Sequence, residues 1–410
     1  MMKNLKWIAI PVLSLMVGGC DVIQNTTDTP LNLTEAQRKI AQRAEPFGLN
    51  LLDQVAQRAE TDQNVILSPL SVSLAFGLLL NGADAETRTE MEKALALDGM
   101  SAQTINETYR DLLDQLPKAD SKVTFATANA IWYRNTFGPS IKPDYLNTNQ
   151  VYFGAKVQGL DFSSPSAVKT INDWVKENTN GKIEKLVDQL SDTEVMYLTN
   201  ALYFKGKWTH EFKASDTASK PFTSGKGTQV TVNMMQQETT LPYFENPKLQ
   251  AVELPYGNGT YSMTVLLPKS GTTVSDVAAS LKSDWATVAG GLTKQSVELS
   301  LPRWKMNYDI TLNGVLQAMG MERAFNPELA NFSQIADAQL FITEVKHKTF
   351  MEVNEEGTEA AAVTGIGVRV TSAPSSKIVL VNRPFLFVIR EKSTGAFLFV
   401  GRITNPTLGQ

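Results

Sequence analysis

Two side chains of this 410-residue sequence stand in a spacing known from covalent catalysis. Ser166 and Lys169 match the SxxK pattern of serine penicillin-recognising enzymes, in which the lysine can help to activate the serine nucleophile. The SDN and KTG motifs that accompany SxxK in those enzymes do not occur in the sequence. The surrounding segment, SPSAVKTINDW, predicts instead the capped first turn of a helix, so we expect no hydrolase site at this pair.

The rest of the sequence offers little for catalysis or metal binding. It contains no HExxH zinc motif, no GxSxG elbow, no Walker loop and no GxGxxG motif that opens a helix after a strand. Cys20 is the single cysteine, which excludes an intrachain disulfide and a thiolate metal cluster. Of the two histidines, His210 lies in a polar segment and suggests no role. We therefore expect neither a metal nor another cofactor.

The second histidine belongs to a segment with strand periodicity. In FITEVKHKTFMEV, Val345, His347 and Thr349 fall on one face at period two, while Lys346 and Lys348 fall on the other. The imidazole of His347 should therefore point into the core. We predict a buried, neutral histidine held by hydrogen bonds, rather than a metal ligand or a catalytic base.

The next segment, EEGTEAAAVTGIGVRVTSAPSSK (residues 355–377), combines small side chains with strand periodicity. Every second residue from Thr358 to Val370 is small or apolar and would share one face, whereas Glu359 and Arg369 lie on the other. No proline interrupts the run before residue 374. Because its buried face is small, such a strand could enter an existing sheet without rearranging the core. The alternative is an exposed, flexible linker rich in alanine and glycine.

The elements that must position these residues follow from periodicity and from β-branched content. Strands are expected at Val123–Tyr133, Val195–Phe204, Ala251–Leu254, Tyr261–Leu267, Val297–Leu301, Phe341–Val353, Ile378–Ile389 and Ala396–Ile403. Helices are expected at Thr34–Ala59, Ser166–Asn178 and Asp309–Met319, and between residues 64 and 83 a short strand should break at Ser68-Pro69 into a buried helix. Strands and helices mix without strict alternation, which predicts the α+β class. No linker interrupts residues 34–410, so we expect one large domain.

The N-terminus has the layout of a bacterial lipoprotein signal. In MMKNLKWIAIPVLSLMVGGC, two lysines precede an apolar stretch from Trp7 to Val17, and small residues precede Cys20. The stretch is too short for a comfortable transmembrane helix. We expect residues 1–19 to be a signal peptide, Cys20 to be lipidated, and residues 20–33 to form a flexible tether. The protein would then be an exported lipoprotein that is anchored to a membrane and faces the periplasm or the cell surface; an ordinary signal near a free thiol is the alternative.

The overall composition and charge limit the classes of binding partner. With 42% hydrophobic and 20% charged residues, the chain has the composition of a globular protein with an ample core. Its net charge of −4 provides no basic field, and the sequence has no long run of like charge. We expect no nucleic-acid partner and a monomeric protein.

Several separated segments resemble motifs of the serpin family, in the order that the family has them. EEGTEAAA (residues 355–362) resembles the proximal hinge of inhibitory serpins. NVILSPLS (64–71) and YLTNALYFKGKW (197–208) are similar to the segments that carry the family's shutter serines, shutter asparagine and upper-sheet tryptophan. His347 matches the shutter histidine, and NRPFLF (382–387) and FVGRITNP (399–406) are similar to the C-terminal signatures. The resemblance covers nearly all of residues 34–410.

This resemblance implies a serpin fold, with a large central mixed β-sheet, surrounding helices, further β-sheets and an exposed reactive-centre loop. It also implies roles for particular residues. The hinge would consist of Glu355, Glu356, Gly357, Thr358, Glu359, Ala360, Ala361 and Ala362. The shutter would contain Ser68, Ser71, Asn200 and His347, with His347 hydrogen-bonded to Asn200 and to the serine-bearing segment, and Trp208 would lie at the upper opening of the sheet.

The resemblance further implies that the protein is not an enzyme but a suicide inhibitor of serine proteases and, by the same chemistry, of cysteine proteases. The nucleophile of the target would attack the loop and form an acyl-enzyme, and the chain from Gly357 onward would then insert into the central sheet with the protease attached. The target protease would be the covalently bound partner. A non-inhibitory serpin that acts as a binding or chaperone-like protein is the alternative.

The reactive bond follows from the family's hinge count. Taking Glu355 as the first hinge position places the seventeenth at Thr371, so the bond would be Thr371-Ser372. The stretch before NRPF looks slightly longer than the common pattern, which leaves Arg369-Val370 and Val370-Thr371 as alternatives. An arginine would suit a trypsin-like protease, whereas the other bonds would suit elastase-like or subtilisin-like enzymes.

Overall fold

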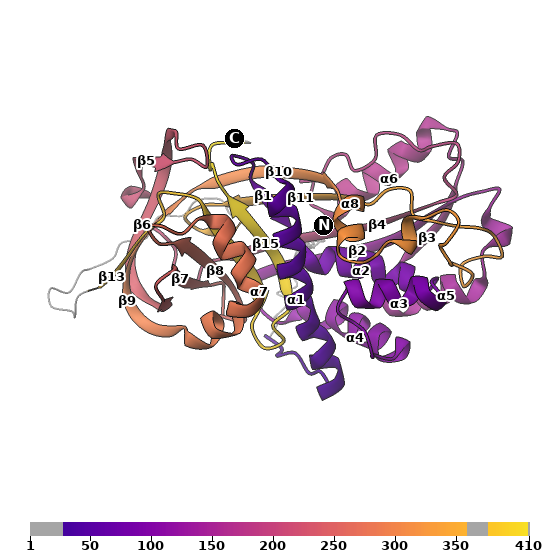
Figure 1. Ribbon diagram of the computed structural model, residues 1–410, viewed down its shortest axis with the longest axis horizontal. Coiled ribbons are helices and arrows are strands. Elements are labelled where there is room, and N and C mark those ends of the chain that lie inside the picture. The colour runs from indigo at the N-terminus through magenta and orange to yellow at the C-terminus, as the bar shows by residue number, and fades with distance from the viewer. Residues whose placement is uncertain (1–27, 359–375, 409–410) are drawn as a thin grey trace, which may run out of the picture.

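The computed structural model of the chain describes residues 28–358 and 376–408. Four groups of predicted residues lie outside these ranges: the signal peptide with Cys20, residues 21–27 of the expected tether, the hinge residues from Glu359 to Ala362, and the candidate reactive bonds between Arg369 and Ser372. In the described ranges the chain forms two β-sheets with helices around them (Figure 1). The predicted α+β class is confirmed.

The helices begin at side chains suited to capping. Thr34 accepts a hydrogen bond from the backbone of Gln37 at the start of the first helix, and Ser68 accepts one from the backbone of Ser71 at the start of the second. The α-helices are α1 (Glu35–Arg58), α2 (Pro69–Leu80), α3 (Ala85–Ala94), α4 (Ala102–Gln115), α5 (Pro143–Phe153), α6 (Pro165–Asn178), α7 (Val274–Gly291) and α8 (Asn313–Ala318). Short 3₁₀ turns are η1 (Leu116–Lys118), η2 (Gly138–Ser140), η3 (Ala214–Asp216) and η4 (Arg323–Phe325).

The strands form a nine-stranded sheet and a six-stranded sheet. The nine-stranded sheet has the order β1 (Val65–Leu67), β15 (Phe397–Ile403), β14 (Phe385–Glu391), β8 (Tyr261–Pro268), β7 (Leu249–Pro255), β6 (Gln229–Glu245), β9 (Thr293–Pro302) and β13 (Lys377–Leu380), and β5 (Ala218–Thr223) pairs with β6. The six-stranded sheet has the order β10 (Trp304–Thr311), β11 (Lys346–Val353), β12 (Gly357–Thr358), β4 (Met196–Lys207), β2 (Val123–Arg134) and β3 (Lys156–Leu160). It is mixed, because β2 and β3 run parallel and the other neighbours antiparallel.

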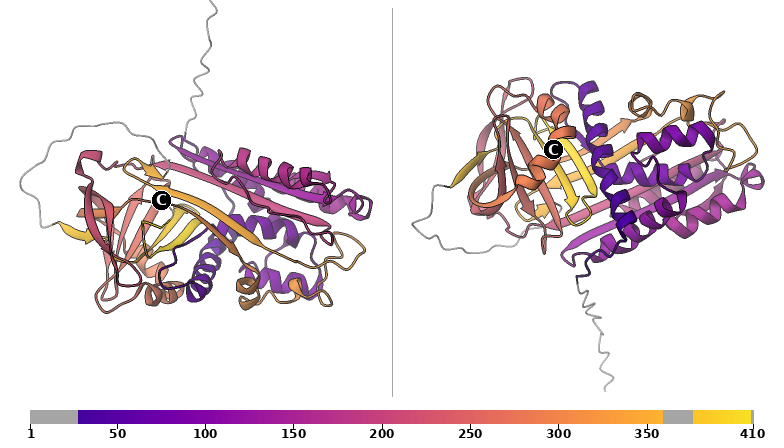
Figure 2. Two further views of the ribbon diagram at one scale, coloured as in Figure 1. Left: turned by 90° about the horizontal axis from the view of Figure 1, so that it is seen from above. Right: turned by 60° about the horizontal axis from the view of Figure 1, so that its bottom comes forward.

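The six-stranded sheet lies between two layers of helices. Along β2 the side chains alternate, so that Ala130 and Trp132 pack with the apolar face of α6. Asn129 instead donates a hydrogen bond to the carbonyl of Phe153 at the end of α5. Figure 2 shows α6 on one side of the long strands and the N-terminal helices on the other. The nearly uniformly apolar α2 is buried in the second layer, as the sequence predicts.

For three of the predicted segments, the structure shows a local cause for the difference in boundaries. The strand expected from Phe341 begins only at Lys346, because the side chain of Asn313 bonds the backbone of Thr343 and Val345 and takes it out of the ladder. The helix expected from Asp309 begins at Asn313. Asp309 itself lies in β10, opposite Lys348 of β11 in the antiparallel register and ion-paired with it at 2.8 Å.

The strand expected at Ile378–Ile389 divides into β13 and β14. Pro384 lies between them, and a proline cannot donate to a ladder. The guanidinium of Arg383 also fixes this turn, because it donates two hydrogen bonds to the carbonyl of Pro268.

The last residues of the expected tether pack against the folded chain. Leu31 and Leu33 are buried, with 6% and 5% of their surface exposed. The Asp28 carboxylate accepts hydrogen bonds from the backbone of Ser121 and from the amide of Asn258. The expectation of a free tether up to residue 33 is therefore wrong for residues 28–33. The apolar leucines at alternate positions were the signal that the sequence interpretation passed over.

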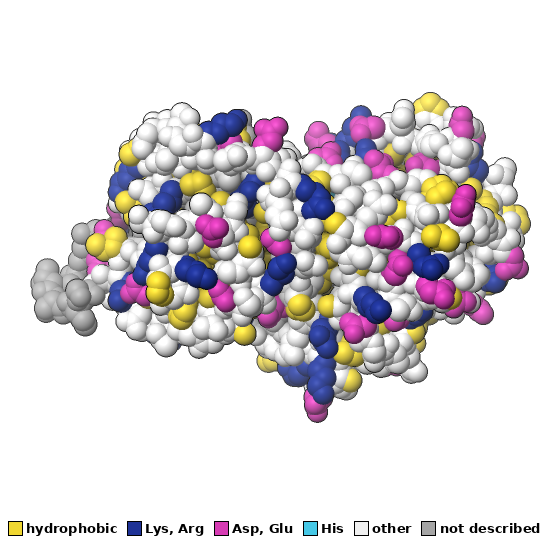
Figure 3. Space-filling view, viewed as in Figure 1, with side chains coloured by type: hydrophobic (Ala, Val, Ile, Leu, Met, Phe, Trp, Pro, Cys, Tyr) yellow, Lys and Arg dark blue, Asp and Glu magenta, His cyan; other side chains and the backbone are white. Residues whose placement is uncertain are grey.

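The distribution of surface charge and the character of the helices bear on possible partners. On the face drawn in Figure 3, lysines and arginines are interspersed with acidic residues, so this face carries no field of one sign. Among the described residues, none of the helices combines the length and the apolar character needed to span a bilayer.

Candidate functional site

The six-stranded sheet is open between β4 and β11. Among the described residues, β11 pairs with β10 on one side and with β12 on the other, while β4 pairs with β2 and β12. The strand β12 consists of Gly357 and Thr358 alone. We call the space between β4 and β11 beyond Thr358 the strand gap. Two strands that would otherwise be neighbours are thus held apart, with a short piece of the predicted hinge between them at one end.

Gly357 occupies a position that only glycine fits. Its φ is +155°, and a Cβ atom placed on it would lie 2.0 Å from the carbonyl oxygen of Gly206 on β4. The hinge therefore enters the sheet through a close approach of two backbones. This explains physically why a glycine stands at this point of the sequence.

Thr358 completes the contact with both neighbouring strands. It is opposite Val353 of β11 and Gly206 of β4, and only 3% of its surface is exposed. Its hydroxyl lies 2.7 Å from the hydroxyl of Tyr256, inside the core. Thr358 is the first residue on the face of the inserting strand that the sequence predicts to be buried, and its side chain is indeed buried.

Glu355 anchors the chain just before this entry point. Its carboxylate accepts hydrogen bonds from the hydroxyl of Thr217 (2.5 Å) and from Nε of Arg303 (2.6 Å). Burial would raise the pKa of Glu355, but the hydrogen bonds of Arg303 and Thr217 outweigh it and hold the pKa below its usual range. The carboxylate is therefore ionised at neutral pH and clamps the hinge to strand-end residues of both sheets.

The neighbouring Glu356 has no such compensation. It is 6% exposed, and neither of its carboxylate oxygens has a hydrogen-bond partner among the described residues. Burying a carboxylate without a partner costs free energy. Withdrawal of the hinge from the sheet would return this group to water. The pairing of Gly357 and Thr358 with the sheet is therefore opposed by the free energy of burying the Glu356 carboxylate.

Trp208 closes the end of the gap where the hinge enters. Its indole N–H donates to the carbonyl of Asn354 (3.0 Å), and its ring stacks on Tyr256 with centroids 4.4 Å apart. The backbone N–H of Trp208 also donates to the carbonyl of Glu356 (2.7 Å). The structure thus brings the predicted upper-sheet tryptophan into contact with the predicted hinge.

Farther along the gap, His347 joins β11 to the start of α2. The backbone N–H of Ser68 donates to Nε2 of His347 (3.0 Å), which requires an unprotonated nitrogen at that position. Burial lowers the pKa of His347 to about 4, although the charge of Asp309 opposes the shift. The predicted buried, neutral histidine and its bond to the serine-bearing segment are confirmed. Ser71 takes part through its backbone, which donates to the Ser68 hydroxyl (3.2 Å).

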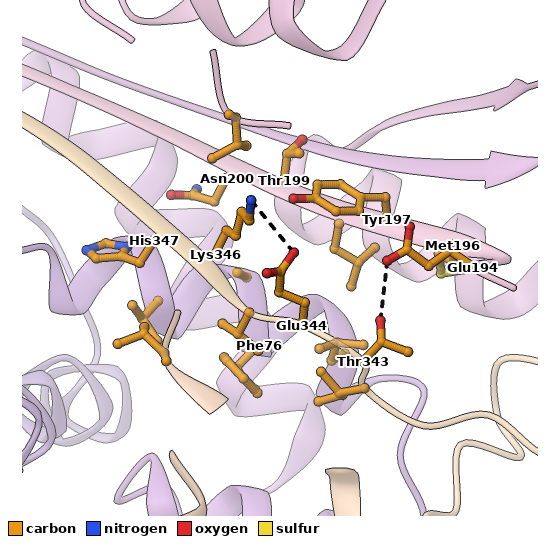
Figure 4. Close-up of a pocket in the computed structure, with 18 of the residues that line it drawn as sticks. Phe76, Glu194, Met196, Tyr197, Thr199, Asn200, Thr343, Glu344, Lys346 and His347 are labelled. Carbon is orange, nitrogen blue, oxygen red and sulfur yellow. Dashed lines mark hydrogen bonds and ion pairs between the residues drawn. The ribbon is translucent and has the colours of Figure 1, made fainter. Parts of the chain in front are cut away.

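Asn200 lies across the gap from His347 but does not bond it (Figure 4). Its amide nitrogen donates to Asn129 Oδ1 (2.8 Å) on the neighbouring strand β2, while its own Oδ1 is buried and has no partner among the described residues. The predicted His347–Asn200 hydrogen bond is therefore wrong for this state, because the gap separates the two strands. Asn129 is the partner that the sequence interpretation missed.

The gap widens into a cavity of about 270 Å³ between β4, the segment before β11, and α2. Its walls combine apolar side chains of α2, such as Phe76, with Met196 and Leu198 of β4. Glu344, which is ion-paired with Lys346, and Glu194, which accepts a hydrogen bond from Thr343, lie at its rim (Figure 4). The cavity is lined by apolar and polar side chains of β4, α2 and the segment that leads into β11, and this position between two strands suits an extended peptide chain.

The SxxK pair has the structural role that its sequence predicts. Ser166 and Lys169 lie in the first turns of α6 on its exposed side, where Lys169 pairs with Asp173 one turn later. The capping side chain is Ser164, two residues earlier than the motif serine. Among the described residues, no cluster of three or more histidine, cysteine or acidic side chains could hold a metal.

The family model for serpins, described as serine protease inhibitors, matches residues 42–406 of the chain. The chain belongs to the serpin family. Human serpin B11 is 33% identical over 369 residues, which cover 84% of this chain and 93% of that protein. Leukocyte elastase inhibitor A of Mus musculus is 34% identical and covers 88% of this chain and 97% of its own length.

Solved serpin structures agree with this assignment. The thermophilic serpin tengpin in its native state has a TM-score of 0.82 at 32% identity, and covers 92% of this chain and 96% of its own. Human thyroxine-binding globulin complexed with thyroxine has a TM-score of 0.80 at 28% identity, with 91% and 100% covered. The serpin fold expected from the sequence is confirmed.

The hinge and shutter signatures recognised in the sequence therefore lie along the strand gap. They form a path from Glu355 and Trp208 at one end of the gap to His347 and Ser68 farther along it. Arg303, Thr217 and Tyr256 complete this path, and they were not predicted because each is a single polar or aromatic residue without a local pattern. A buried tyrosine and an arginine next to an expected hinge carboxylate become informative only when the sheet brings them together.

Proposed function

We propose that this serpin is a suicide inhibitor of proteases and not an enzyme. The serine or cysteine of the target attacks the carbonyl carbon of the reactive bond, the amine of the following residue leaves with a proton, and an acyl-enzyme remains. Insertion of the acylated loop into the strand gap then displaces the protease before water hydrolyses the ester or thioester. Small displacements of reacting groups are costly for catalysis, so the distorted protease stays acylated.

The observation that carries this proposal is the pairing of Gly357 and Thr358 with both edges of the strand gap. These two residues set the register that a longer insertion would follow. Since Thr358 is opposite Gly206 and Val353, a residue six positions later would be opposite Asn200 and His347. That residue is Thr364, whose hydroxyl could donate to the unpartnered Oδ1 of Asn200.

The side chains that would enter fit the gap. In this register every second residue after Thr358 faces the same side as the buried residues of β11, which are His347, Thr349, Met351 and Val353. The sequence supplies Ala360 and Ala362 for the first of these positions. Small side chains can enter there without displacing α2, and this supports an inhibitor more than a protein whose loop stays outside.

Strand length supports the displacement. From Gly206 to Met196, β4 offers a template of about ten residues, which corresponds to roughly 33 Å at 3.3 Å per residue. If each inserted residue gains on the order of 1 kcal/mol from hydrogen bonding, insertion supplies on the order of 10 kcal/mol before burial is counted. A drive of this size can compete with the loss of the protease's native contacts.

Covalent trapping can be tested directly with the full-length chain. The protein is mixed separately with trypsin, elastase and subtilisin and analysed on denaturing gels. A band near the summed mass that survives denaturant is the expected result. Clean cleavage between residues 363 and 375 without such a band, for every protease, would contradict the inhibitor proposal. It would favour a non-inhibitory binding protein, a role with which the similarity to thyroxine-binding globulin is compatible.

The identity of the cleaved bond is a separate part of the proposal. We place it at Thr371-Ser372, with Arg369-Val370 and Val370-Thr371 as bonds for proteases of other specificity. Mass spectrometry of the released C-terminal peptide identifies the bond for each protease. A single bond outside residues 369–372 would contradict the placement while leaving the inhibitor mechanism intact.

We also propose that the serpin is a monomer anchored to a membrane through a lipidated Cys20. The signal-like N-terminus and the small residues before this cysteine support the anchor. The variant Cys20→Ser should move the protein from the membrane fraction to the soluble fraction of the producing bacterium. Retention of the variant in the membrane fraction would contradict lipidation.

A further inference from the structure

The strand that follows the reactive loop carries exposed apolar side chains. Large hydrophobic residues with substantial exposure are scattered over the described surface, but two of them, Ile378 and Leu380, stand on the short strand β13. Their exposed fractions are 64% and 38%, whereas Val379 between them is buried at 1%. The two side chains therefore share one outward face of β13. Single exposed hydrophobic residues are normal, but an adjacent pair on one strand face needs a reason.

This face belongs to a firmly held strand. β13 pairs in parallel with β9 and forms the edge of the nine-stranded sheet. Just before it, the hydroxyl of Ser376 donates to Glu238 (2.7 Å), and Lys377 pairs with Glu245 (2.9 Å). The side-chain amide of Gln250 donates to the carbonyl of Ile378 (3.0 Å). The apolar pair is thus presented on a fixed support, which lowers the entropy lost when a partner binds.

The length of chain between the reactive bond and β13 limits what can lie against this face. Ile378 is six residues after Ser372, a separation of at most about 20 Å in a fully extended chain. A protease domain is about 30–40 Å across by the size scaling of globular domains. A protease that holds the bond in its active site must therefore approach β13, on the side of the leaving amine.

We propose that Ile378 and Leu380 form a secondary docking site for the target protease, which contacts its apolar rim on the leaving-group side of the active site. This inference rests on the proposed function, which supplies the target protease as the partner. It concerns the rate of encounter and not the trapping step. Contact with the pair would stabilise the encounter complex in which the loop is attacked, so it would speed loop cleavage whether or not the protease is then trapped.

The test measures the second-order rate constant for loop cleavage in the full-length chain with the double variant Ile378→Ser and Leu380→Ser. The protease is whichever of trypsin, elastase and subtilisin cleaves the parent fastest. A fall of about tenfold is expected for loss of two apolar contacts. The variant Ile378→Leu, which keeps an apolar side chain, should retain the parental rate within about twofold.

The chain offers matched controls at other exposed hydrophobic residues. Val151 is 55% exposed on α5, which Figure 1 places at the opposite end of the molecule from β13. Leu329 is 49% exposed outside the helices and strands. The variants Val151→Ser and Leu329→Ser should leave the rate unchanged, and all variants should keep the parental unfolding temperature.

The outcomes separate this inference from the inhibitor proposal. Equal cleavage rates for the double variant and the parent would overturn the docking site, even if covalent trapping is observed. Slower cleavage without any covalent complex would support the docking site while contradicting inhibition. A change of oligomeric state in sedimentation, with no change in cleavage rate, would assign the face to a second copy of the chain and would also overturn the proposal.

Discussion

At the residue scale, the proposed inhibitor mechanism relies on a few side chains that are small or neutral for physical reasons. Gly357 permits a backbone approach that no other residue allows, and Thr358 fills the space beside Tyr256. His347 must remain unprotonated to accept the hydrogen bond of Ser68. Changes of size or charge at these positions should therefore affect insertion or stability selectively, and not only the general packing of the core.

The first residue-scale prediction concerns Thr358→Arg. Thr358 is buried between β11 and β4, and a guanidinium there would lose its hydration without a designated partner. Insertion should become slow enough for deacylation to win, so the fraction of protease trapped on denaturing gels should fall more than tenfold while loop cleavage continues. Thr358→Ser keeps the hydroxyl near Tyr256 and serves as the control. A Thr358→Arg protein that traps protease as well as the parent would refute this role of the hinge.

The second residue-scale prediction concerns pH. The pKa of buried His347 is about 4, below the value of about 6.5 expected in the unfolded chain. Between these values the unfolded chain binds more protons than the folded chain, so this contribution to stability is complete above pH 6.5 and is lost as the pH falls toward 4. The loss amounts to at most roughly 3 kcal/mol.

Urea unfolding at several pH values measures this contribution. The variant His347→Gln should show a flatter dependence of unfolding on pH between 6.5 and 4 than the parent. His210 is exposed and is the one other histidine of the sequence, so His210→Gln is the matched control and should follow the parental curve. If the His347 variant and the parent have the same pH dependence, the imidazole is not the titrating group.

At the element scale, helices and strands with a clear local pattern were predicted from the sequence. Strands that form because distant segments pair with them were missed. The segments that became β8, β14 and β15 are mostly apolar and buried, and α2 and α6 carry clear capping residues, so these were recognised. The 17-residue strand β6 is mostly polar and exposed on one side, and it is a strand because β5, β7 and β9 pair with it. Such a strand has no strong local signal.

At the functional site too, residues on local motifs were predicted and contacts that depend on strand pairing were not. The residues on motifs, such as His347 and Trp208, were assigned to the correct region, because their neighbours in sequence carry the family pattern. The separation of Asn200 from His347 could not be predicted, since it depends on whether a strand lies between β4 and β11. The local sequence pattern around either residue does not decide whether such a strand is present.

One element-scale prediction concerns the inserted strand. If Thr364 arrives opposite Asn200, its hydroxyl should satisfy the Asn200 Oδ1, which has no hydrogen-bond partner in the part of the chain that the structure describes. Thr364→Val keeps the size of the side chain and should destabilise the loop-cleaved form by about 1–3 kcal/mol, with little effect on the intact form. Thermal unfolding of both forms, in a cycle with Asn200→Ala, measures the coupling. Additive effects of the two substitutions would place Thr364 elsewhere.

A further element-scale prediction concerns the N-terminal segment 28–33. Leu31 and Leu33 are buried in the core cluster beside α4, so each leucine-to-alanine substitution should reduce the free energy of unfolding by about 2–5 kcal/mol. Asn32 between them is exposed, and its contact to Gln115 uses its backbone, so Asn32→Ala should change stability little. Urea unfolding of the three variants makes the comparison. Equal stability of all three would mean that this segment does not contribute to the fold.

At the scale of the whole molecule, the described residues leave the sheet position between β4 and β11 beyond Thr358 without a strand. The unpaired edges of β4 and β11, the cavity over α2 and the unpartnered Glu356 and Asn200 oxygens all lie along this position. Each would be improved by a strand in the gap or by withdrawal of the hinge. In the proposed mechanism, the intact protein therefore pairs its hinge with the sheet only at Gly357 and Thr358 among the described residues, and a fully inserted loop would be the better-paired arrangement.

The whole-molecule prediction is that cleavage of the reactive loop makes the serpin more stable, although it breaks a covalent bond. Cutting near Thr371 frees the hinge side of the loop to fill the strand gap, which should add on the order of 10 kcal/mol of pairing and raise the unfolding temperature by at least about 10 °C. Differential scanning fluorimetry before and after limited proteolysis, with the C-terminal peptide still bound, provides the measurement. The Thr358→Arg protein, cleaved at the same bond, is the control and should show a much smaller rise, because its hinge resists entry. An unchanged or lower unfolding temperature in the cleaved parent would mean that the gap stays empty, and the displacement step of the inhibitor mechanism would then have no source of free energy.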